Sequence, residues 1–529
     1  MNSKGIKLNK THILEAMEAA AVHYRSGNFE DAKAIYQRVL KEDSNNGDAL
    51  HFLGLADFSL QNYPAALTSI TKAIAIYPNL APLHSNLGSV LRKIGRISEA
   101  LESYDQAITL NPKYAKAHLN RGVLLREQGL YSEALASLNH ALELDPNDAD
   151  IFDNYGNALR DLGKFNEAVA MFDYGISLNP DSPEIHMNRG NVLADLKLIS
   201  KAIASYERSI HLRPGYPEAH LNKAHALLAN GQFEEGFELY EWRWRTAMFC
   251  GRPRSFAQPL WLGAQSLSEK SILLYAEQGI GDVIQFGRYV KSVSDLGAHV
   301  ILEVPEKLVS LMKSLDGHYE VFSAESTLPP FDYRCPLMSL PLALKTTLHN
   351  IPFAKGYLKA DPKRVSQIEQ ELKLQNPHSK KLCGISWLSK ADKTGLFRSI
   401  YLKDFITALA KDDFLYVNLQ YGEVGQEISE AAKELGISVI HLDSVNLYDD
   451  IDGLAAIIEA CDLVISIDNT TVHLAGALGK ETRVLLPHVP AWRWLLDGKD
   501  SPWYESLKLY RQPAVFDWGG AFAQLKEDL

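Results

Sequence analysis

The spacing of apolar and polar residues changes near Ser271 and divides the chain into two halves. Before this point, small and apolar residues recur every 34 positions, with stretches of helical length between them. After it, short apolar runs of strand length alternate with helical stretches, which is the pattern of a parallel sheet covered by helices. The sequence therefore predicts an α-helical repeat array followed by an α/β region.

Three residue types keep the 34-residue period in the first half. They are Gly54, Gly88, Gly122, Gly156 and Gly190, then Ala32, Ala66, Ala100, Ala134, Ala168 and Ala202, and then Pro78, Pro112, Pro146, Pro180 and Pro214. The glycine and the alanine let the two helices of a hairpin approach closely, and the proline ends the second helix. Period and residue types match the tetratricopeptide repeat (TPR) pattern, with a capping unit expected at Pro217–Cys250.

Asparagines form a second ladder with the same period: Asn86, Asn120, Asn154, Asn188 and Asn222. Asparagine is a mediocre helix former, so five in register require an explanation. One explanation is that each side chain caps or bridges its neighbouring helix. The other is that they line the groove of the array and clamp an extended polypeptide, because a carboxamide both donates and accepts hydrogen bonds. The second explanation resembles the asparagine ladder in the TPR superhelix of O-GlcNAc transferases, which grips polypeptide acceptors.

Between the two halves, tryptophans alternate with arginines, as in Trp242, Arg243, Trp244 and Arg245. Buried tryptophan with arginine is typical of interface anchors, so we expect this stretch to dock the array on the next domain. A nucleic-acid surface is the alternative. The expected division is a tail (1–12), the TPR array with its cap (13–250), a junction (251–270), a first lobe (271–355), a linker and helix (356–380), a second lobe (381–512) and a C-terminal segment (513–529).

Two sets of strands are predicted in the second half, and they indicate two Rossmann-like lobes. The final segment, Asp517–Leu529, is expected to cross back to the first lobe. The predicted strands of the first set are Ser271–Ala276, Val300–Val304, Tyr319–Phe322 and Tyr333–Pro336, and those of the second are Leu382–Trp387, Leu415–Gln420, Val439–Leu442, Leu463–Ile467 and Val484–Leu486.

The stretch Asp462–Lys480 combines a buried strand, a polar turn and a small-residue helix that Gly479 ends. Unpaired backbone N–H groups at the start of such a helix, together with its dipole, make an anion site. The alternative is an ordinary strand–helix unit that a threonine caps. From this stretch alone, both interpretations remain open.

The same stretch resembles the D-T-G-x-x-H-L-A-A-A-L-G signature of the heptosyltransferase-like family of GT-B glycosyltransferases (glycosyltransferase family 9). The family's Thr and Gly are Asn469 and Thr470 here. The resemblance covers about residues 271–512 and implies a GT-B fold. A TPR array followed by this pair of lobes also resembles bacterial TPR-containing glycosyltransferases, including flagellin-modifying ones. The matching positions are Asp468, His473, Leu474, Ala475, Ala477, Leu478 and Gly479.

The resemblance also implies roles for individual residues. Asp282, after the first predicted strand, matches the family's general base, whereas its alternative role is to cap the following helix. Glu277 is the second candidate for the base. The first lobe would take the acceptor and the second lobe the nucleotide-sugar. Residues expected to bind the donor are Lys393 and Arg398 at its phosphates, Glu427 at its ribose, and Asp468, Asn469, Thr470, Thr471 and His473 around the anion helix.

Composition and the absence of certain motifs limit the kinds of partner, compartment and cofactor that are expected. The net charge of −11 argues against a nucleic-acid partner, and the four cysteines are too dispersed for a disulfide framework or a zinc site. No secretory signal and no run of about 18 apolar residues is found, so we expect a cytoplasmic protein without a membrane span. No D-x-D at a strand end and no H-E-x-x-H occurs. The expectation is therefore metal-independent chemistry with no cofactor, the nucleotide-sugar being a substrate.

The repeat array and the resemblance of the second half to glycosyltransferases together imply an inverting glycosyltransferase, which would move a sugar from a nucleotide-sugar to Ser or Thr hydroxyls of a protein in the TPR groove. By analogy with the flagellin-modifying relatives, flagellin is the candidate acceptor and a CMP-linked nonulosonic acid the candidate donor. Two alternatives stay open. One is an enzyme that acts on a glycan or lipopolysaccharide and recruits partners with its TPR array. The other is a non-catalytic TPR adaptor.

Overall fold

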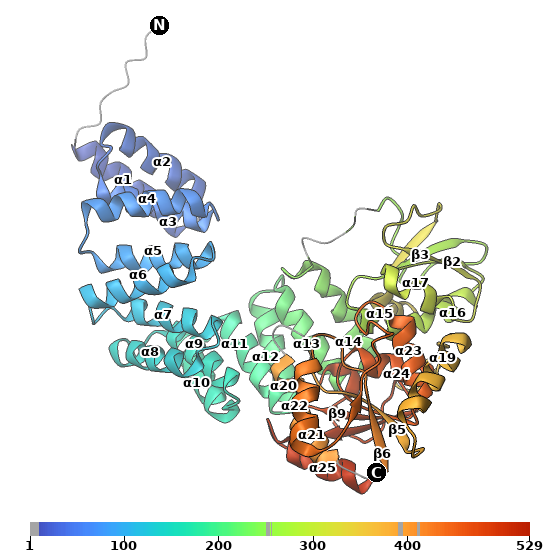
Figure 1. Ribbon diagram of the computed structural model, residues 1–529. Coiled ribbons are helices and arrows are strands. Elements are labelled where there is room, and N and C mark those ends of the chain that lie inside the picture. Colours follow the sequence, from blue (N-terminus) through green and yellow to red (C-terminus); the bar gives the residue numbers. More distant parts are fainter. Residues whose placement is uncertain (1–9, 250–253, 255, 390–394, 410–412) are drawn as a thin grey trace. The chain divides into compact units, whose positions relative to one another are not determined.

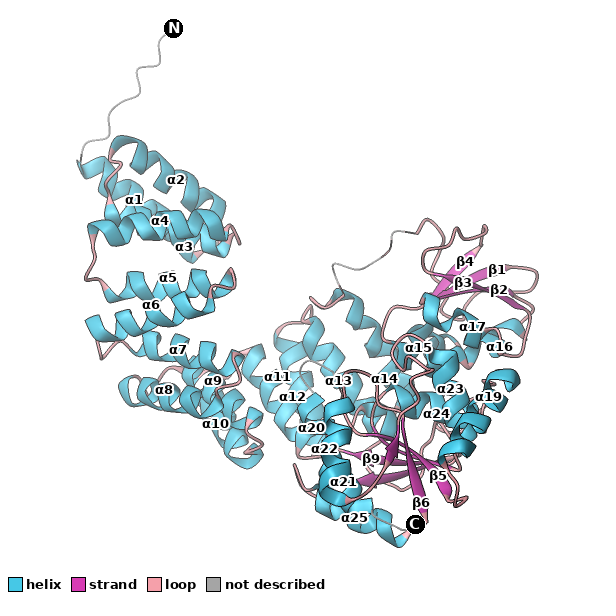
Figure 2. Ribbon diagram, viewed as in Figure 1, coloured by secondary structure: helices cyan, strands magenta, loops and turns pink. Residues whose placement is uncertain are grey.

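The computed structural model describes residues 10–249, 254, 256–389, 395–409 and 413–529 of the chain (Figure 1). The chain divides into two compact units, Met1–Leu196 and Lys197–Leu529. In the described part of the first unit every regular element is a helix, whereas all described strands belong to the second unit (Figure 2).

The first unit consists of antiparallel helix hairpins of the TPR type. The glycines of the 34-residue period lie where the hairpin helices touch. A Cβ atom on Gly88, for example, would lie 2.6 Å from a ring carbon of Tyr104. Its helices are α1 (Lys10–Arg25), α2 (Phe29–Glu42), α3 (Gly47–Ser59), α4 (Tyr63–Ile76), α5 (Ala81–Lys93), α6 (Ile97–Leu110), α7 (Ala115–Glu127), α8 (Tyr131–Leu144), α9 (Ala149–Asp161), α10 (Phe165–Leu178) and α11 (Pro183–Asp195).

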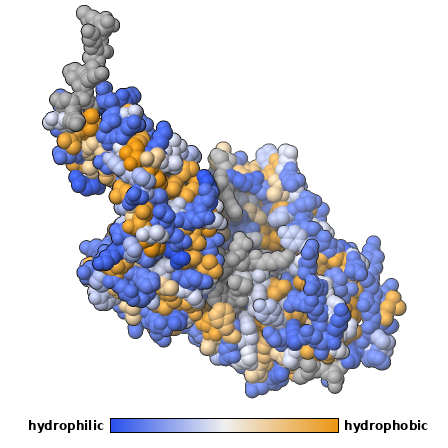
Figure 3. Space-filling model, turned by 60° about the vertical axis from the view of Figure 1, so that its left-hand side comes forward, coloured by the Kyte–Doolittle hydropathy of each residue, from blue (hydrophilic) through white to orange (hydrophobic). Residues whose placement is uncertain are grey.

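The periodic alanines are fully buried on the second helix of each hairpin. A larger side chain would push the paired helices apart, so glycine and alanine together set the close spacing. Hydrophobic side chains remain on the surface of this unit, and Figure 3 shows hydrophobic residues in small groups among hydrophilic ones on the face that it draws. The large exposed ones include Phe52, Tyr77, Leu80, Leu130, Leu144 and Tyr174.

The second unit begins with three more TPR helices. Their contacts are mainly with the rest of the second unit, so they are part of it and not of the first unit. Phe233 and Phe237 of the last hairpin are buried in the hydrophobic core that they share with both sheets. The array predicted over 13–250 is thus divided at residue 196, because its last helices pack on the α/β region. These elements are α12 (Ile199–Leu212), α13 (Pro217–Ala229), α14 (Phe233–Tyr240) and the 3₁₀ helix η1 (Glu241–Arg245).

The first sheet has four parallel strands in the order β3-β2-β1-β4. In its register Ser271 pairs with His299, and Ile272 pairs with Tyr333. Its elements are β1 (Ser271–Tyr275), α15 (Ile280–Gly287), α16 (Tyr289–Ser294), β2 (His299–Val304), η2 (Glu306–Leu308), α17 (Val309–Met312), β3 (Tyr319–Ser323), β4 (Tyr333–Pro336), η3 (Leu337–Ser339) and α18 (Leu340–Ala343).

The second sheet has six parallel strands in the order β10-β9-β8-β5-β6-β7. Buried β-branched and leucine residues fill the central strand β8, as expected for a strand covered on both faces. Its elements are α19 (Pro362–Gln375), β5 (Lys381–Ser386), α20 (Gly395–Arg398), α21 (Leu402–Leu409), β6 (Phe414–Asn418), α22 (Gly425–Leu435), β7 (Val439–Ile440), α23 (Ile451–Ala460), β8 (Leu463–Ile467), α24 (Thr470–Leu478), β9 (Thr482–Leu486), η4 (Trp492–Trp494), β10 (Leu507–Arg511) and α25 (Trp518–Glu527).

The C-terminal part differs from the sequence analysis in two ways. The strand β10 was not predicted, although it adds an edge to the second sheet beside β9. The last helix α25 does not cross back to the first sheet. Its buried residues Ala521, Phe522 and Leu525 pack in a core cluster with Phe405 and Tyr510 of the second sheet's own layers. The apolar face of α25 therefore packs against the second sheet and its helices.

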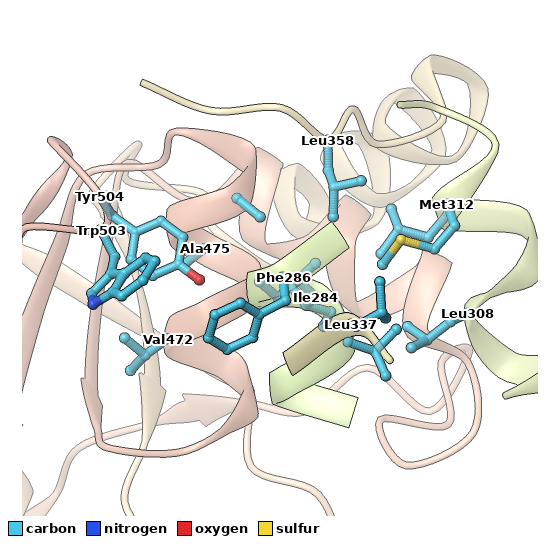
Figure 4. Packing of buried hydrophobic residues seen from close by; sticks show 14 of the residues in the cluster. Ile284, Phe286, Leu308, Met312, Leu337, Leu358, Val472, Ala475, Trp503 and Tyr504 are labelled. Atoms are coloured by element: carbon cyan, nitrogen blue, oxygen red, sulfur yellow. The ribbon is translucent and has the colours of Figure 1, made fainter. Parts of the chain in front are cut away.

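The two sheets are joined through a common core in which α15 packs against α24 (Figure 4). Phe286 of α15 and Val472 and Ala475 of α24 are fully buried there. The segment between α18 and α19, which links the two sheets, is hydrogen-bonded to α24. The backbone N–H groups of Tyr357 and Leu358 both donate to the carbonyl of Ala477. The C-terminal end of α24 thereby holds the linker.

Candidate functional site

The N-termini of α15 and α24 meet, although each follows a different sheet. A Cβ atom on Gly281 would lie 3.1 Å from Cδ2 of His473 and 3.6 Å from Oγ1 of Thr470. Glycine at this position therefore allows the first helix to approach the second. The carboxyl ends of parallel strands are where α/β proteins bind ligands. The two polar turns that the sequence singles out, residues 277–282 and 468–473, come together here.

Asp282 carries two kinds of contact at this place. Its Oδ2 accepts a hydrogen bond from the N–H of Gly279 at 3.0 Å, so it does cap α15 as the alternative interpretation holds. Its Oδ1 forms an ion pair with Arg493 of η4. The Asp282 side chain is 21% exposed, so it is not sealed from solvent.

Arg493 is the member of this site that sequence reasoning missed. Its Nε donates to Oε1 of Gln285 at 2.8 Å, and its guanidinium lies 4.7 Å from the ring centroid of Trp492. Burial is the largest single influence on the pKa of Arg493 and lowers it, but Asp282 and the other neighbouring acidic groups together outweigh burial and the pKa is raised. The Trp-Arg-Trp spacing of η4 could have indicated an anchor, but nothing local connects it with a residue 211 positions earlier.

His473 is a buried, neutral member of the site. Its ring lies 5.3 Å from the ring of Trp494 in a stacked arrangement, and its Nδ1 lies 3.1 Å from the hydroxyl of Tyr504. Burial keeps the pKa of His473 well below 6.5, and the positive charges of Arg493 and Arg288 lower it further. A neutral imidazole with one nitrogen bound to a tyrosine can offer at most its other nitrogen to a ligand.

The turn between β8 and α24 is the polar turn that the sequence predicts, but Asn469 and not a threonine caps the helix. Oδ1 of Asn469 accepts from the N–H of Thr471 at 3.0 Å and so caps the helix, while its Nδ2 donates to Oγ of Ser386 on β5 at 2.7 Å. Gly479 ends the helix with a φ of 77°. The Asn469 side chain thus serves as the N-cap and also ties two neighbouring strands of the sheet together.

Asp468 and Arg398 form an ion pair beside this turn, with Nη1 and Oδ2 3.2 Å apart. Oδ2 of Asp468 is buried, and its contact with the guanidinium lacks hydrogen-bond geometry. The Arg398 side chain is 24% exposed, so its cation can also reach a ligand. Lys393, the other expected phosphate ligand, lies outside the described residues.

Glu427 contacts the protein with both carboxylate oxygens. Oε2 accepts from the indole N–H of Trp387 at 3.0 Å, and Oε1 accepts from the N–H of Leu402 at 2.8 Å. These bonds give Glu427 a structural role, since they tie α21 and the end of β5 to α22. Its expected contact with a ribose stays a prediction.

In the first unit, the asparagine ladder bridges consecutive repeats. Nδ2 of Asn120 donates to Oγ of Ser85 at 3.1 Å, and Nδ2 of Asn188 donates to Oδ1 of Asp153 at 2.8 Å. Asn86 contacts His51 in the same way, whereas Asn154 donates to the carbonyl of Asp150 within its own helix. Bridging between repeats therefore accounts for the amide nitrogens of Asn86, Asn120 and Asn188. None of the four hydrogen bonds described here, including that of Asn154, uses the carboxamide oxygen. Asn222 lies in the second unit, on α13.

No group of three or more His, Cys, Asp or Glu side chains in the described ranges is placed to hold a metal ion, and the metal-independent chemistry stays a prediction. Among the helices that the structure describes, none is both long enough and apolar enough to span a membrane.

Comparison with known families places TPR repeats in the N-terminal part of the chain. Tetratricopeptide repeat families match residues 17–81, 85–149 and 199–241, and again 137–170, and a TPR repeat family matches 156–197. The Protein FlbA of Caulobacter vibrioides (strain ATCC 19089 / CIP 103742 / CB 15) is 29% identical over 306 residues. This match covers 54% of the chain, which spans about half the length of that relative.

Two solved TPR proteins are similar to part of the chain. A thermophilic TPR protein of Thermus thermophilus is 23% identical, with 34% of this chain and 99% of that chain covered and a TM-score of 0.32. A tetratricopeptide repeat protein from Parabacteroides merdae ATCC 43184 is 18% identical, with 43% and 91% covered and a TM-score of 0.37.

Proposed function

We propose that the protein is a glycosyltransferase of GT-B architecture that moves a sugar from a nucleotide-sugar to hydroxyl groups of a polypeptide. The observation that carries the proposal is the meeting of the α15 and α24 N-termini, with Asp282 on one side and Arg493, Arg398 and His473 on the other. A helix N-terminus with two guanidinium groups near it suits the phosphates of a nucleotide. A carboxylate beside it suits a hydroxyl acceptor.

In the proposed reaction, the acceptor oxygen forms a bond to the anomeric carbon of the sugar. The bond from that carbon to the phosphate oxygen breaks, and the nucleotide leaves with the negative charge. Asp282 takes the proton of the acceptor hydroxyl, which makes the oxygen nucleophilic as it attacks. Arg398 and the N–H groups of α24 stabilise the charge on the leaving phosphate. The ion pair with Arg493 must then loosen when substrate enters, so that Asp282 can reach the hydroxyl.

The TPR repeats are the proposed binding surface for the acceptor polypeptide. Repeat arrays of this kind present extended surfaces that bind proteins. The carboxamide oxygens of Asn86, Asn120, Asn154 and Asn188 are available to accept from the backbone N–H groups of an extended chain. Flagellin is the candidate acceptor, and a CMP-linked nonulosonic acid is the candidate donor.

A non-catalytic adaptor is the second candidate. It is favoured by Asp282, whose two oxygens are both engaged by the protein, and by Thr470, which stands where the resembled family has glycine. Nucleotide release in the presence and absence of flagellin separates the two functions. An enzyme releases nucleotide when donor and acceptor are both present, and an adaptor binds the polypeptide without release. Thermal unfolding with UDP-, GDP-, ADP- and CMP-nucleotides identifies the donor, because a bound nucleotide raises the melting temperature.

Changing Arg398 to alanine should raise the KM for the donor or lower kcat by about 10–100-fold, because a cation that faces the leaving phosphate is lost. Steady-state kinetics with varied nucleotide-sugar measure the effect. Lys403→Ala is the matched control, since Lys403 pairs with Glu434 on the surface, away from the turn. Kinetics of Arg398→Ala equal to those of the control would place the phosphate site elsewhere.

Changing Asn154 to alanine should weaken binding of flagellin but leave the free energy of unfolding within about 0.5 kcal/mol, because its side chain bonds within its own helix. Asn188→Ala should weaken binding and also cost about 1 kcal/mol, since it removes the bridge to Asp153. Pull-down affinity and unfolding followed by circular dichroism measure the two effects. Asn139→Ala, on the exposed face of α8, is the control. If none of these changes alters flagellin binding, the proposal that the asparagines of the TPR array bind the acceptor is contradicted.

A further inference from the structure

The ring of His473 has one nitrogen bound to the protein and one that faces the meeting point of α15 and α24. Nδ1 lies 3.1 Å from the hydroxyl oxygen of Tyr504. Cδ2, which is bonded to Nε2 in the ring, is the atom nearest to a Cβ placed on Gly281. Nε2 has no hydrogen-bond partner in the described part of the chain and is not one of the fully buried polar atoms there, so it is open to a ligand.

The position of the single ring hydrogen decides what Nε2 of His473 can do. Burial holds the pKa of His473 well below 6.5, and the nearby arginines lower it further, so the imidazole is neutral. With the hydrogen on Nε2 the ring donates to an anion, whereas with the hydrogen on Nδ1 it presents a lone pair that an anion repels. The hydrogen bond at Nδ1 sets which of the two forms is present.

The Tyr504 hydroxyl is placed to donate to Nδ1. Burial raises the pKa of Tyr504 well above 10, so the hydroxyl keeps its hydrogen. The same hydroxyl also interacts with the side chains of Arg288 and Tyr357. A guanidinium can only donate, so Arg288 occupies a lone pair of the Tyr504 oxygen and leaves the hydrogen of Tyr504 to an acceptor.

Tyr357 is the rival acceptor for that hydrogen. Its own hydroxyl donates to the carbonyl of Ile284 at 2.8 Å, and its oxygen accepts from Nη2 of Arg288 at 3.4 Å. An imidazole nitrogen with a lone pair is a more basic atom than a phenol oxygen, and this phenol oxygen already accepts from a cation. Nδ1 of His473 is therefore the better acceptor of the two.

Arg288 lies behind Tyr504 and is nearly fully buried. Nε donates to the carbonyl of Gln285 at 2.8 Å and Nη1 donates to the carbonyl of Trp503 at 2.6 Å, while the guanidinium lies 4.6 Å from the centroid of the Tyr504 ring. Its hydrogen-bond acceptors in the described ranges are carbonyl and hydroxyl oxygens, which do not neutralise its charge. A cation that donates to a hydroxyl oxygen polarises the O–H bond and strengthens it as a donor.

We propose that Tyr504, supported by Arg288, is a positioning residue that holds the hydrogen of His473 on Nε2, so that His473 donates to the phosphate of the bound nucleotide. The inference rests on the donor site proposed above at the start of α24. It adds to that site a tyrosine and a buried arginine that do not touch the nucleotide themselves.

NMR of the full chain with ¹⁵N in the histidine rings tests the position of the hydrogen, with no nucleotide present. The signals of His473 are those that His473→Gln lacks, and they should show the hydrogen bonded to Nε2. Tyr504→Phe keeps the ring but removes the hydroxyl, so it should shift the Nδ1 signal. Tyr510→Phe is the matched control, because it removes another buried hydroxyl, which donates to Asp528. A hydrogen on Nδ1, or equal signals in Tyr504→Phe and Tyr510→Phe, would overturn the proposal.

Nucleotide affinity tests the contact with phosphate. CMP, UDP, GDP and ADP are the probes, and the one that raises the melting temperature most is titrated by calorimetry. Tyr504→Phe should weaken its binding by about 3–10-fold, the effect of one hydrogen bond. His473→Gln, whose amide keeps a donor near the position of Nε2, should bind more tightly than His473→Leu. Equal binding by Tyr504→Phe and Tyr510→Phe would contradict the positioning role, and thermal unfolding without nucleotide checks that each variant folds.

Failure of this inference is distinguishable from failure of the proposed activity. A hydrogen on Nδ1 in a chain that binds nucleotide and transfers sugar would contradict only this inference. A chain that binds nucleotide with the help of Tyr504 and His473 but transfers no sugar would contradict only the proposed activity. Binding of none of the four nucleotides would contradict both.

Discussion

Changing Asp282 to asparagine should lower the rate of sugar transfer by about 10²–10⁴-fold, the usual contribution of a general base. Asparagine has the size of aspartate and is as good a helix cap, so its oxygen can still accept from Gly279. It cannot take a proton at neutral pH. The loss of the ion pair with Arg493 should cost about 1–3 kcal/mol of stability, and Arg493 keeps its bond to Gln285.

The measurement is transfer to the acceptor protein followed by intact mass, with nucleotide affinity and thermal unfolding determined on the same sample. Asp295→Asn is the matched control, because Asp295 pairs with Lys291 on the surface of the same sheet's helical layer. Transfer near the unchanged rate would exclude Asp282 as the base, and Glu277 would then be the next residue to change. Loss of transfer together with unfolding would support the capping role alone.

Features that depend on nearby residues were predictable from the sequence. The TPR hairpins follow from a period that a single chain displays, and TPR repeats in the N-terminal region are confirmed by the family comparisons. Parallel sheets follow from apolar runs between helices, and nine of the ten described strands overlap predicted strands to within two residues at each end. The cap of α24 by Asn469 is also local, because a polar turn before a helix carries its own signal.

Features that tertiary packing decides were not predictable. Arg493 pairs with Asp282, which is 211 positions earlier in the chain. No local sequence pattern around either residue indicates that the two are in contact. Strand β10 has a charged residue, Lys508, between its apolar ones, ends at Arg511 and lies at a sheet edge, so its apolar run is too short to identify it. The asparagine ladder shows a different limit. Its period was visible, but whether the amide nitrogens face a ligand or the next repeat depends on the spacing of the helices.

The candidate site was predictable only in part. The turn that contains Asp282 does meet the start of α24, since Gly281 lies beside Thr470 and His473, and both turns follow parallel strands. Glu427 illustrates the opposite outcome, since a carboxylate after a strand end can equally well bind Trp387 and Leu402. Sequence position specifies which edge of a sheet a side chain occupies. It does not specify whether protein groups already use all of its hydrogen-bonding capacity.

Trp503 should contribute strongly to the stability of the second unit. Its side chain is fully buried, and its ring lies 5.7 Å from that of Phe233 and 5.6 Å from that of Phe286. It therefore packs against the last TPR hairpin and the first helix of the first sheet at once. Trp503→Ala leaves a cavity between them and should cost about 3–5 kcal/mol. Trp503→Phe should cost less, because it keeps a ring and removes an indole N–H that has no partner among the described residues.

Tryptophan fluorescence can measure this effect in the full chain, because all eight tryptophans lie in the second unit and none lies in the first. A loss of about 3–5 kcal/mol should lower the melting temperature of the fluorescence transition by roughly 4–8 °C, given the entropy of unfolding of a unit of this size. Trp518→Ala is the matched control, since Trp518 is only partly buried on α25 and its loss changes the fluorescence by one tryptophan as well. A shift for Trp503→Ala no larger than that for Trp518→Ala would show that the hairpin and the first sheet are held together without this ring.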